Sequence, residues 1–188
     1  MIAAEMTSGR NRVRIIGGQW RSRLLRFPPA TQLRPTPDRV RVTLFNWLGQ
    51  RLDGMSCLDL FSGSGALGFE ALSRGAARVV MVERDREAVR ALKDNARLLE
   101  ATGAEIVEGD ALDYLTRPMT APFDVAFVDA PYASDLAARA MERLPAVLAP
   151  GARLYLETAE MPQLGVRWTL LRTDRAGAVR YGLYELAP

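Results

Sequence analysis

Short apolar runs alternate with segments of helical periodicity through most of the chain. The apolar runs lie at residues 56–60, 78–82, 104–107, 124–128 and 153–156, and the helical segments lie at about 66–74, 85–99, 111–116 and 134–148. Uninterrupted runs of this length are typical of strands buried on both faces of a parallel sheet. The alternation therefore predicts a doubly wound α/β sheet. Two more runs, 168–171 and 179–186, have no helix between them, so we expect them to form an antiparallel pair.

Composition is that of a soluble globular protein. The 188 residues suffice for one ordinary domain, and 48% of them are hydrophobic and 25% charged. No run reaches the roughly 18 apolar residues of a membrane span and the start lacks a signal-peptide core, so we expect a cytoplasmic protein without membrane contact. The single cysteine, Cys57, agrees with a reducing compartment. The absence of histidine excludes Ser-His-Asp and Cys-His catalysis and nearly all transition-metal chemistry, so we expect no metal.

The net charge of +3 is the sum of two unlike parts. Residues 1–51 carry ten arginines against Glu5 and Asp38, which gives +8. Residues 52–188 carry fifteen basic residues against twenty acids, which gives −5. Such an asymmetry suggests a part that binds a polyanion on a neutral or acidic body. We therefore divide the chain into a basic arm, residues 1–35, and a body, residues 36–188.

The arm contains a predicted β-hairpin. A two-residue turn at Gly17-Gly18 sets residue 16 opposite 19, 14 opposite 21 and 12 opposite 23. One face of the hairpin then holds four arginines, Arg12, Arg14, Arg21 and Arg23. Because like charges directly opposite each other destabilise a sheet, this face needs solvent screening or a polyanion. A solvated edge hairpin and a nucleic-acid backbone site are both open, and the second is favoured.

A helix is expected to follow the arm. Thr36 is a plausible N-cap, with Pro37 at the first helical position. An apolar stripe then recurs at helical spacing and should pack on the body; its members are Val40, Leu44, Phe45 and Leu48. Arg39 and Arg41 can face either solvent or substrate.

A glycine-rich loop follows the first parallel strand, between Asp59 and Gly68. Gly63 and Gly65 let the backbone approach a ligand closely, and Gly68 allows tight packing of helix on strand. Glu83 ends the next strand, 20 residues after Gly63, where a carboxylate can accept hydrogen bonds from both hydroxyls of a ribose. The loop fits either a dinucleotide or S-adenosylmethionine (SAM).

Two acids bear on the choice of cofactor. The carboxylate of Asp59 is awkward beside a pyrophosphate and suits the ammonium of a methionine moiety, either directly or through water. Asp110 follows the third strand, where it can accept from an adenine amino group or cap a helix, and both roles can hold together. The residue pattern thus favours SAM.

An acid-x-Pro-aromatic segment, Asp129-Ala130-Pro131-Tyr132, follows the fourth strand. Pro131 pushes Ala130 towards an extended conformation, so that its carbonyl can point into the cleft. The Asp129 carboxylate and the Ala130 carbonyl are two acceptors for one exocyclic amine, and Tyr132 offers a ring for stacking. A plain turn at the strand end remains an alternative.

Together these segments resemble class I SAM-dependent amino-methyltransferases. More narrowly, the segments at residues 14–21, 34–40, 44–48 and 65–75 resemble the RsmD family, bacterial methyltransferases acting on N2 of guanine 966 in 16S ribosomal RNA. The resemblance implies a Rossmann-like sheet of seven strands, with SAM over the glycine loop and the target guanine at residues 129–132. One departure is Ala130, where the family usually has proline; alanine keeps the backbone carbonyl but loses local rigidity, so we expect slower turnover.

The candidate residues fall into three groups. The candidate catalytic residues are Asp129, Ala130, Pro131 and Tyr132. The candidate residues for SAM, and for its product S-adenosylhomocysteine, are Asp59, Phe61, Gly63, Ser64, Gly65, Glu83, Asp110 and Ala111. The candidate RNA-binding residues are Arg12, Arg14, Arg21, Arg23, Arg34 and Arg39. The expected partner is 16S rRNA or an assembling 30S subunit, and we expect a monomer.

Other functions stay open at this stage. Another amino-methyltransferase, acting on adenine N6 or on a different guanine, shares the same motif. A NAD(P)-dependent oxidoreductase uses the same kind of loop, and a noncatalytic RNA-binding protein can retain the same fold. A C5-pyrimidine methyltransferase is disfavoured, since it needs a cysteine nucleophile and Cys57 lies within the first strand.

Overall fold

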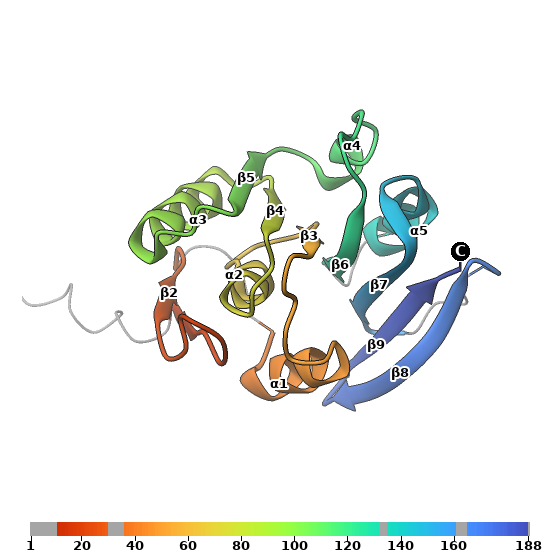
Figure 1. Cartoon of the computed structure of the whole chain (residues 1–188), viewed down its shortest axis with the longest axis horizontal. Coiled ribbons are helices and arrows are strands. Elements are labelled where there is room, and N and C mark those ends of the chain that lie inside the picture. The colour runs from red at the N-terminus through yellow and green to blue at the C-terminus, as the bar shows by residue number, and fades with distance from the viewer. Residues whose placement is uncertain (1–10, 30–35, 132–134, 161–164, 188) are drawn as a thin grey trace, which may run out of the picture.

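The computed structural model describes residues 11–29, 36–131, 135–160 and 165–187, and its chain order is a hairpin followed by an α/β body (Figure 1). The hairpin strands are β1 (Arg12–Arg14) and β2 (Leu24–Arg26). The body runs α1 (Asp38–Trp47), β3 (Ser56–Asp59), α2 (Ala66–Ser73), β4 (Arg78–Glu83), α3 (Arg86–Leu99), β5 (Ala104–Glu108), α4 (Ala111–Tyr114), β6 (Phe123–Asp129), α5 (Leu136–Arg143), a 3₁₀ turn (Leu144–Ala146), β7 (Leu148–Thr158), β8 (Trp168–Ala176) and β9 (Val179–Leu186). No described helix is long and apolar enough to cross a membrane.

The described body strands form one seven-stranded sheet in the order β5-β4-β3-β6-β7-β9-β8. The strands from β5 to β7 are mutually parallel, and β9 lies antiparallel between β7 and β8. The predicted doubly wound sheet with an antiparallel final pair is confirmed. The helix predicted over residues 134–148 ends early, because Pro145 has no N–H for an α-helical hydrogen bond and the chain continues as a 3₁₀ turn.

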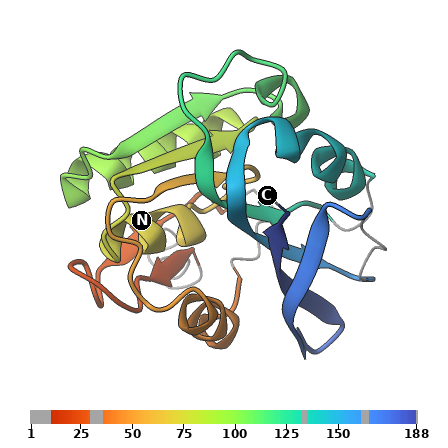
Figure 2. The ribbon, with the colours of Figure 1, turned by 45° about the vertical axis from the view of Figure 1, so that its right-hand side comes forward.

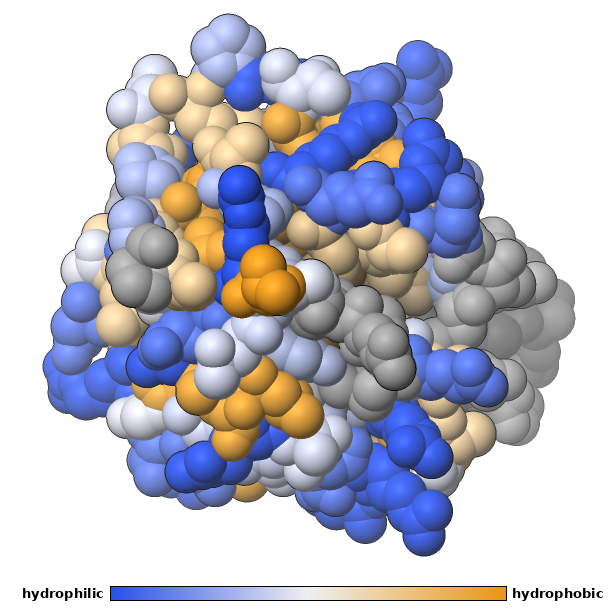
Figure 3. All heavy atoms as spheres, turned by 90° about the vertical axis from the view of Figure 1, so that its right-hand side faces the viewer, coloured by the Kyte–Doolittle hydropathy of each residue, from blue (hydrophilic) through white to orange (hydrophobic). Residues whose placement is uncertain are grey.

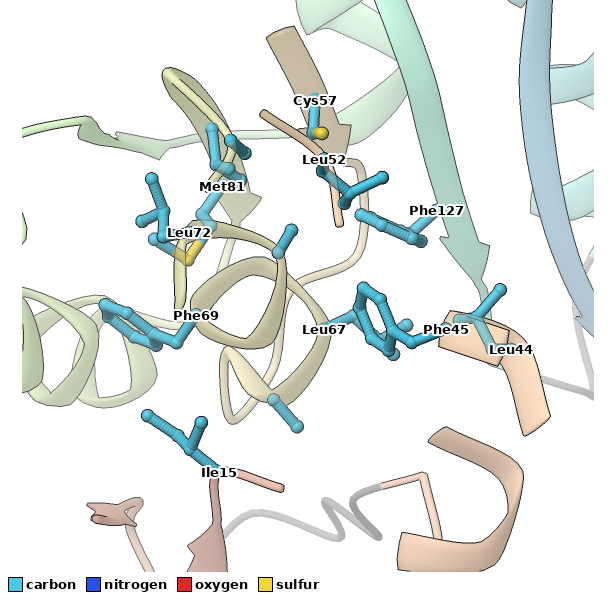
Figure 4. Packing of buried hydrophobic residues seen from close by; sticks show 14 of the residues in the cluster. Ile15, Leu44, Phe45, Leu52, Cys57, Leu67, Phe69, Leu72, Met81 and Phe127 are labelled. Carbon is cyan, nitrogen blue, oxygen red and sulfur yellow. The ribbon is translucent and has the colours of Figure 1, made fainter. Parts of the chain in front are cut away.

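Helices cover both faces of the sheet (Figures 1 and 2). Successive side chains of a strand contribute to opposite faces. On one face Cys57, Met81 and Phe127 pack with residues of α1, α2, α3 and the hairpin. On the other face Leu58 and Val80 pack with residues of α4 and α5. In the close view the Phe45 ring lies beside Phe127, with ring centres 6.0 Å apart (Figure 4). Consecutive buried residues of a strand therefore pack against helices on opposite faces of the sheet, which explains the continuous apolar runs in the sequence.

The hairpin forms, but its predicted register is wrong. Arg12 pairs with Arg26, Val13 with Leu25 and Arg14 with Leu24, so a longer loop replaces the predicted two-residue turn. The two glycines serve another purpose. Gly18, with φ of 74°, lies against the end of α2, where a side chain would overlap the carbonyl oxygen of Ser73. Close approach to α2, rather than a tight turn, therefore accounts for Gly17-Gly18.

Backbone atoms hold the hairpin against the body. The carboxylate of Glu70, wholly buried in α2, accepts hydrogen bonds from the backbone N–H groups of Ile16 and Gly17, both at 2.8 Å. The Ser73 hydroxyl accepts from Trp20 N at 2.9 Å and donates to the Gly17 carbonyl at 2.6 Å. On α3, the Asn95 amide bonds both the N–H and the carbonyl of Arg26. The hairpin is therefore part of the folded core.

The corrected register still leaves the arginines outward. Val13 and Leu25 are buried, and Ile15 between the hairpin and α2 is fully buried (Figure 4). The exposed arginines of the described hairpin are Arg12, Arg14, Arg21, Arg23 and Arg26. Arg14 lies near Asp38, and the guanidinium of Arg23 donates to the Leu98 carbonyl at 3.0 Å. The predicted face of four paired arginines is wrong: Arg12 lies opposite Arg26, and Arg14 lies opposite Leu24. Arg21 and Arg23 belong to the loop between the strands, although all four of the predicted arginines are exposed.

Candidate active site

Acidic residues gather at the carboxyl edge of the parallel strands. Asp59, Glu83, Asp129 and Glu157 stand in or at the ends of β3, β4, β6 and β7, and Asp110 follows β5. Because these strands are parallel, their carboxyl ends share one edge, the usual ligand edge of open α/β sheets. An edge with this many carboxylates favours a cationic ligand over a pyrophosphate.

The glycine loop is held rigidly between β3 and α2. Ser62 donates its N–H to Val82 O at 3.0 Å and its hydroxyl to Asp59 O at 2.8 Å. Gly65 is the N-cap residue of α2 with φ of 75°, and a side chain there would overlap Leu92. A side chain at Gly68 would overlap Met81 on β4, which confirms the expected tight packing of helix on strand.

Glu83 fixes the loop while keeping hydrogen-bonding capacity. One carboxylate oxygen accepts from Gly63 N and the other from Asp85 N, both at 2.8 Å. Each oxygen of a carboxylate has a second lone pair, so both can still accept from the hydroxyls of a ribose. The half-buried side chain at the ligand edge therefore fits the predicted ribose contact.

Asp110 is the N-cap of α4, as one of its two predicted roles required. Its Oδ1 accepts from Leu112 N at 2.8 Å and from Asp113 N at 3.1 Å. The residue is exposed, and its capping interactions use a single oxygen, which leaves Oδ2 available to an adenine amine. Ala111, directly after it, is buried.

Asp59 is more enclosed than the sequence indicates. Its side chain is 3% exposed, and its Oδ2 accepts from Gly68 N at 3.0 Å. Burial raises the pKa of Asp59 to about 7, while the hydrogen bond from Gly68 acts in the opposite direction. A cation arriving at this edge would stabilise the ionised form, which supports the predicted ammonium site.

Asp129 is the most perturbed acid of the site. Burial first, and then the neighbouring carboxylates of Glu157 and Asp59, raise the pKa of Asp129 to about 8. Glu157 is its register partner on β7, is 4% exposed, and accepts from the Tyr155 hydroxyl at 2.8 Å. A carboxyl group in such an environment can accept a proton near neutral pH.

The Thr36 side chain contacts Asp129 and does not cap helix α1. The predicted N-cap role is wrong: Pro37 is the N-cap residue of α1, without a side-chain capping bond. The Thr36 hydroxyl instead donates to Asp129 Oδ2 at 3.3 Å. A partner 93 residues away in the sequence outweighs the local capping preference.

The remaining candidate residues are distributed as follows. Ala130 is buried and Pro131 exposed beside Asp129, Phe61 is half-buried and Ser64 buried in the glycine loop, and Arg39 is exposed on α1. Tyr132 and Arg34 lie outside the described residues.

Sequence reasoning missed Glu157, Thr36 and Glu70 as members of the polar network around the site. Glu157 had a detectable signal, an acid at the end of an apolar strand, the same signal that singled out Asp129. Glu70 had none, since it lies within the mostly apolar segment that forms α2.

Two open cavities in the described part of the chain lie away from these acids. One, of about 680 Å³, lies where β6 begins and is lined by residues that include Trp47, Asp124 and Arg153. The other, of about 620 Å³, separates β2 from α3 and is lined by residues that include Arg26 and Arg90. Neither contains a candidate cofactor residue. Figure 3 shows a further face, the one that carries β8 and β9, where hydrophilic residues surround small hydrophobic patches.

The strand order, the glycine loop after β3 and the acids at the carboxyl edge define a class I SAM-dependent methyltransferase. The family model described as "Conserved hypothetical protein 95" matches residues 13–185. The chain belongs to this family, that of the ribosomal RNA small subunit methyltransferases D.

Individual relatives agree with this assignment. The ribosomal RNA small subunit methyltransferase D of Escherichia coli is 43% identical over 95% of this chain and 92% of its own. A solved structure described as a methyltransferase, also from Escherichia coli, has a TM-score of 0.86 at 42% identity and covers 94% of this chain and 98% of its own. An RNA methyltransferase from Salinibacter ruber, solved with S-adenosyl-L-homocysteine, shares the fold with a TM-score of 0.62 at 21% identity, over 82% of this chain and 94% of its own.

Proposed function

We propose that the protein transfers the methyl group of SAM to the exocyclic N2 amine of guanine 966 in 16S ribosomal RNA. The observation that carries the proposal is the 43% identity to a ribosomal RNA small subunit methyltransferase D over 95% of the chain. The matched family region begins at residue 13 and therefore includes the hairpin as well as the methyltransferase body.

The residues at the acidic edge fit SAM. Glu83 would hold the ribose hydroxyls, Asp110 the adenine amine, and Asp59 the ammonium through water, since its own carboxylate is nearly covered. The remaining members of the cofactor site are Phe61, Gly63, Ser64, Gly65 and Ala111. Bound SAM supplies an activated methyl group, which bonds to the amine nitrogen as its bond to sulfur breaks and the sulfur keeps the electron pair.

Asp129 would act on the amine. An exocyclic amine is a poor nucleophile, because its lone pair is conjugated with the ring. When the Asp129 carboxylate and the Ala130 carbonyl accept hydrogen bonds from the two N–H groups of the amine, a pyramidal nitrogen with an available lone pair is favoured. Transfer of the methyl group leaves a positive charge on the nitrogen, and Asp129 can take the released proton because its pKa is raised to about 8. Tyr132 would stack on the base, and Pro131 would orient the Ala130 carbonyl.

The exposed arginines of the arm, residues 1–35, would bind the RNA backbone. Arg12, Arg14, Arg21 and Arg23 are exposed, and the docked hairpin gives them a fixed position on the body, residues 36–188. Arg34 and Arg39 complete the proposed set. We also propose that the protein acts as a monomer in the cytoplasm, on free 16S rRNA or on an assembling 30S subunit.

The direct test offers methyl-labelled SAM with unmodified 16S RNA and, separately, with 30S particles. We expect label in N2-methylguanosine with at least one of the two substrates. Label in adenine, or in DNA only, would contradict the proposed substrate. RNA binding without any methyl transfer would indicate a noncatalytic RNA-binding protein, and binding of NAD without SAM would indicate an oxidoreductase.

A second prediction concerns the exposed arginines of the hairpin. Changing Arg12, Arg14, Arg21 and Arg23 together to alanine should weaken RNA binding and lower the slope of log K against log salt by roughly 3, because each phosphate contact contributes about 0.7 to 0.9. Affinity for SAM should not change. The measurement is RNA binding from about 50 to 300 mM salt, the range in which counterion release dominates.

The matched control removes four exposed arginines from the other end of the sheet, Arg167, Arg172, Arg175 and Arg180. This control lowers the net charge by the same amount as the hairpin variant. If only the hairpin variant lowers the slope of log K against log salt, the effect comes from a local RNA site and not from the net charge. Equal slopes for the two quadruple variants would count against the hairpin as the RNA site.

A further inference from the structure

Thr36 and Asp129 belong to a polar chain that runs from the hairpin to the candidate catalytic acid. The chain begins at the backbone N–H groups of Ile16 and Gly17, which donate to Glu70. Glu70 lies 3.4 Å from an Arg41 guanidinium nitrogen, and both side chains are fully buried. Each further link is a hydrogen bond between buried or half-buried groups, and none of the three side chains Thr36, Arg41 and Glu70 is exposed.

Arg41 holds the backbone of Thr36. Its Nε donates to the Thr36 carbonyl at 3.1 Å, and another guanidinium nitrogen pairs with Asp38 at 2.7 Å. A buried guanidinium must satisfy its donors, because leaving one unpaired is costly. The fork geometry of arginine thus fixes the carbonyl of Thr36 relative to α1 and α2.

The Thr36 hydroxyl then reaches the acid. It is 5% exposed and donates to Asp129 Oδ2 at 3.3 Å, which is long for an O–H···O hydrogen bond. Hydrogen bonds to catalytic groups are often long without substrate and shorten when it binds. Among the described residues, the charged groups that act on Asp129 are Glu157 from β7 and Asp59 from β3, and both disfavour its ionised form. Thr36 acts in the opposite direction, since its donated hydrogen bond favours the carboxylate.

We propose that Thr36 is a positioning residue for methyl transfer: its hydroxyl orients the Asp129 carboxylate and favours the ionised form of this acid, and Arg41 fixes Thr36 in place. One oxygen of Asp129 is thereby engaged by Thr36, and the other is turned towards the amine. This inference rests on the proposed function, because it assumes that Asp129 accepts the hydrogens of the guanine amine.

The test compares the pH–rate profiles of the wild type, Thr36→Val, Thr36→Ser and a control variant, Thr169→Val. The rate measured is that of single-turnover methyl transfer to the RNA substrate. Thr36→Val removes the hydroxyl at nearly constant volume. At pH 7 we expect its rate to fall about three- to tenfold, the effect of one ordinary hydrogen bond, and the acid limb of its profile to move to higher pH. The deficit should shrink at alkaline pH, where Asp129 is ionised without help. Thr36→Ser should keep both the rate and the profile of the wild type.

Two controls accompany this comparison. Thr169→Val removes an exposed hydroxyl from the edge strand β8 and should leave the profile unchanged. The dissociation constant for SAM, measured by calorimetry, should stay within about twofold for every variant, since one lost hydrogen bond to SAM would exceed that factor. If Thr36→Val folds poorly, Thr36→Ala removes the same hydroxyl and carries the same expectation.

The outcomes separate this inference from the proposed function. A Thr36→Val profile that matches the wild type, or a rate loss that is the same at every pH, would overturn the role of Thr36, provided that Asp129→Asn shows its expected large loss of rate. If Asp129→Asn keeps the wild-type rate, or if the wild type does not methylate guanine N2, the proposed function itself fails.

Discussion

Replacing Asp129 by alanine should slow methyl transfer by about 10²- to 10⁴-fold, the range typical of a group that moves a proton in the transition state. The variant loses both the acceptor for the amine hydrogens and the acceptor for the released proton. Asp129→Asn keeps one acceptor oxygen but cannot take a proton, so we expect a loss in the same range and no larger than that of alanine. The measurement is the single-turnover rate with saturating SAM.

The pH dependence of the wild type gives the same assignment an independent readout. The ionised form of Asp129 is the active form, so the rate should rise with pH and level off above the pKa of about 8. Both variants at position 129 should lose this limb. A profile that is unchanged in Asp129→Asn would mean that another group titrates.

Stability offers a control for folding. The folded protein raises the pKa of Asp129 above the unfolded value of about 3.8, so ionisation opposes folding. This acid therefore lowers stability progressively as pH rises from about 4 to about 8. Asp129→Asn should melt at a higher temperature than the wild type at pH 8, and the difference should shrink at pH 5. Asp53→Asn, an exposed carboxylate before β3, should change neither rate nor profile.

Glu70→Ala should lower the free energy of unfolding by about 3 to 5 kcal/mol, a large share of the total of about 5 to 15 kcal/mol for a typical domain. The substitution removes one of the two described ion pairs of the Arg41 guanidinium, which is fully buried, and leaves the pair with Asp38. It also removes the acceptors for the N–H groups of Ile16 and Gly17. A buried charge that loses one of its two acidic partners and two unpaired backbone donors account for the expected size.

Urea denaturation measures the loss, and amide hydrogen exchange locates it. Exchange at Ile16 and Gly17 should accelerate more than exchange in β4 or β6, because the hairpin loses its main anchor. Glu142→Ala, an exposed glutamate in α5, should change stability by no more than about 0.5 kcal/mol. Similar unfolding curves for the two variants would show that Glu70 does not anchor the hairpin.

The body of the fold was predictable because its signals are local. β9 was predicted with its observed bounds, and β4 and β6 to within one residue at each end, since each is a mostly apolar segment between breaks in the pattern. The acids that close those runs, Glu83 and Asp129, were predictable for the same reason. Parallel strands bring their carboxyl ends to one edge, so position along a strand suffices to place such residues.

The hairpin register and the environment of Asp129 were not predictable, because distant partners decide them. Gly17-Gly18 is a strong turn signal, yet α2 lies against it through Ser73, 55 residues after Gly18. Thr36 before Pro37 is a strong capping signal, yet its hydroxyl donates to Asp129. The capping preference at Thr36 is worth about 1 kcal/mol. In both places contacts with the body outweigh the local preference.

The described contacts that dock the hairpin on Glu70, Ser73 and Asn95 all involve its main-chain N–H and carbonyl groups. Main-chain groups are present whatever the side chain, so mutations at the exposed arginines do not disturb these anchors. The exposed Arg14–Asp38 pair adds little to stability. Selection can therefore rewrite the outer face of the hairpin residue by residue without endangering the fold. A methyltransferase built in this way can acquire a new RNA site by surface changes alone, while its catalytic edge stays untouched.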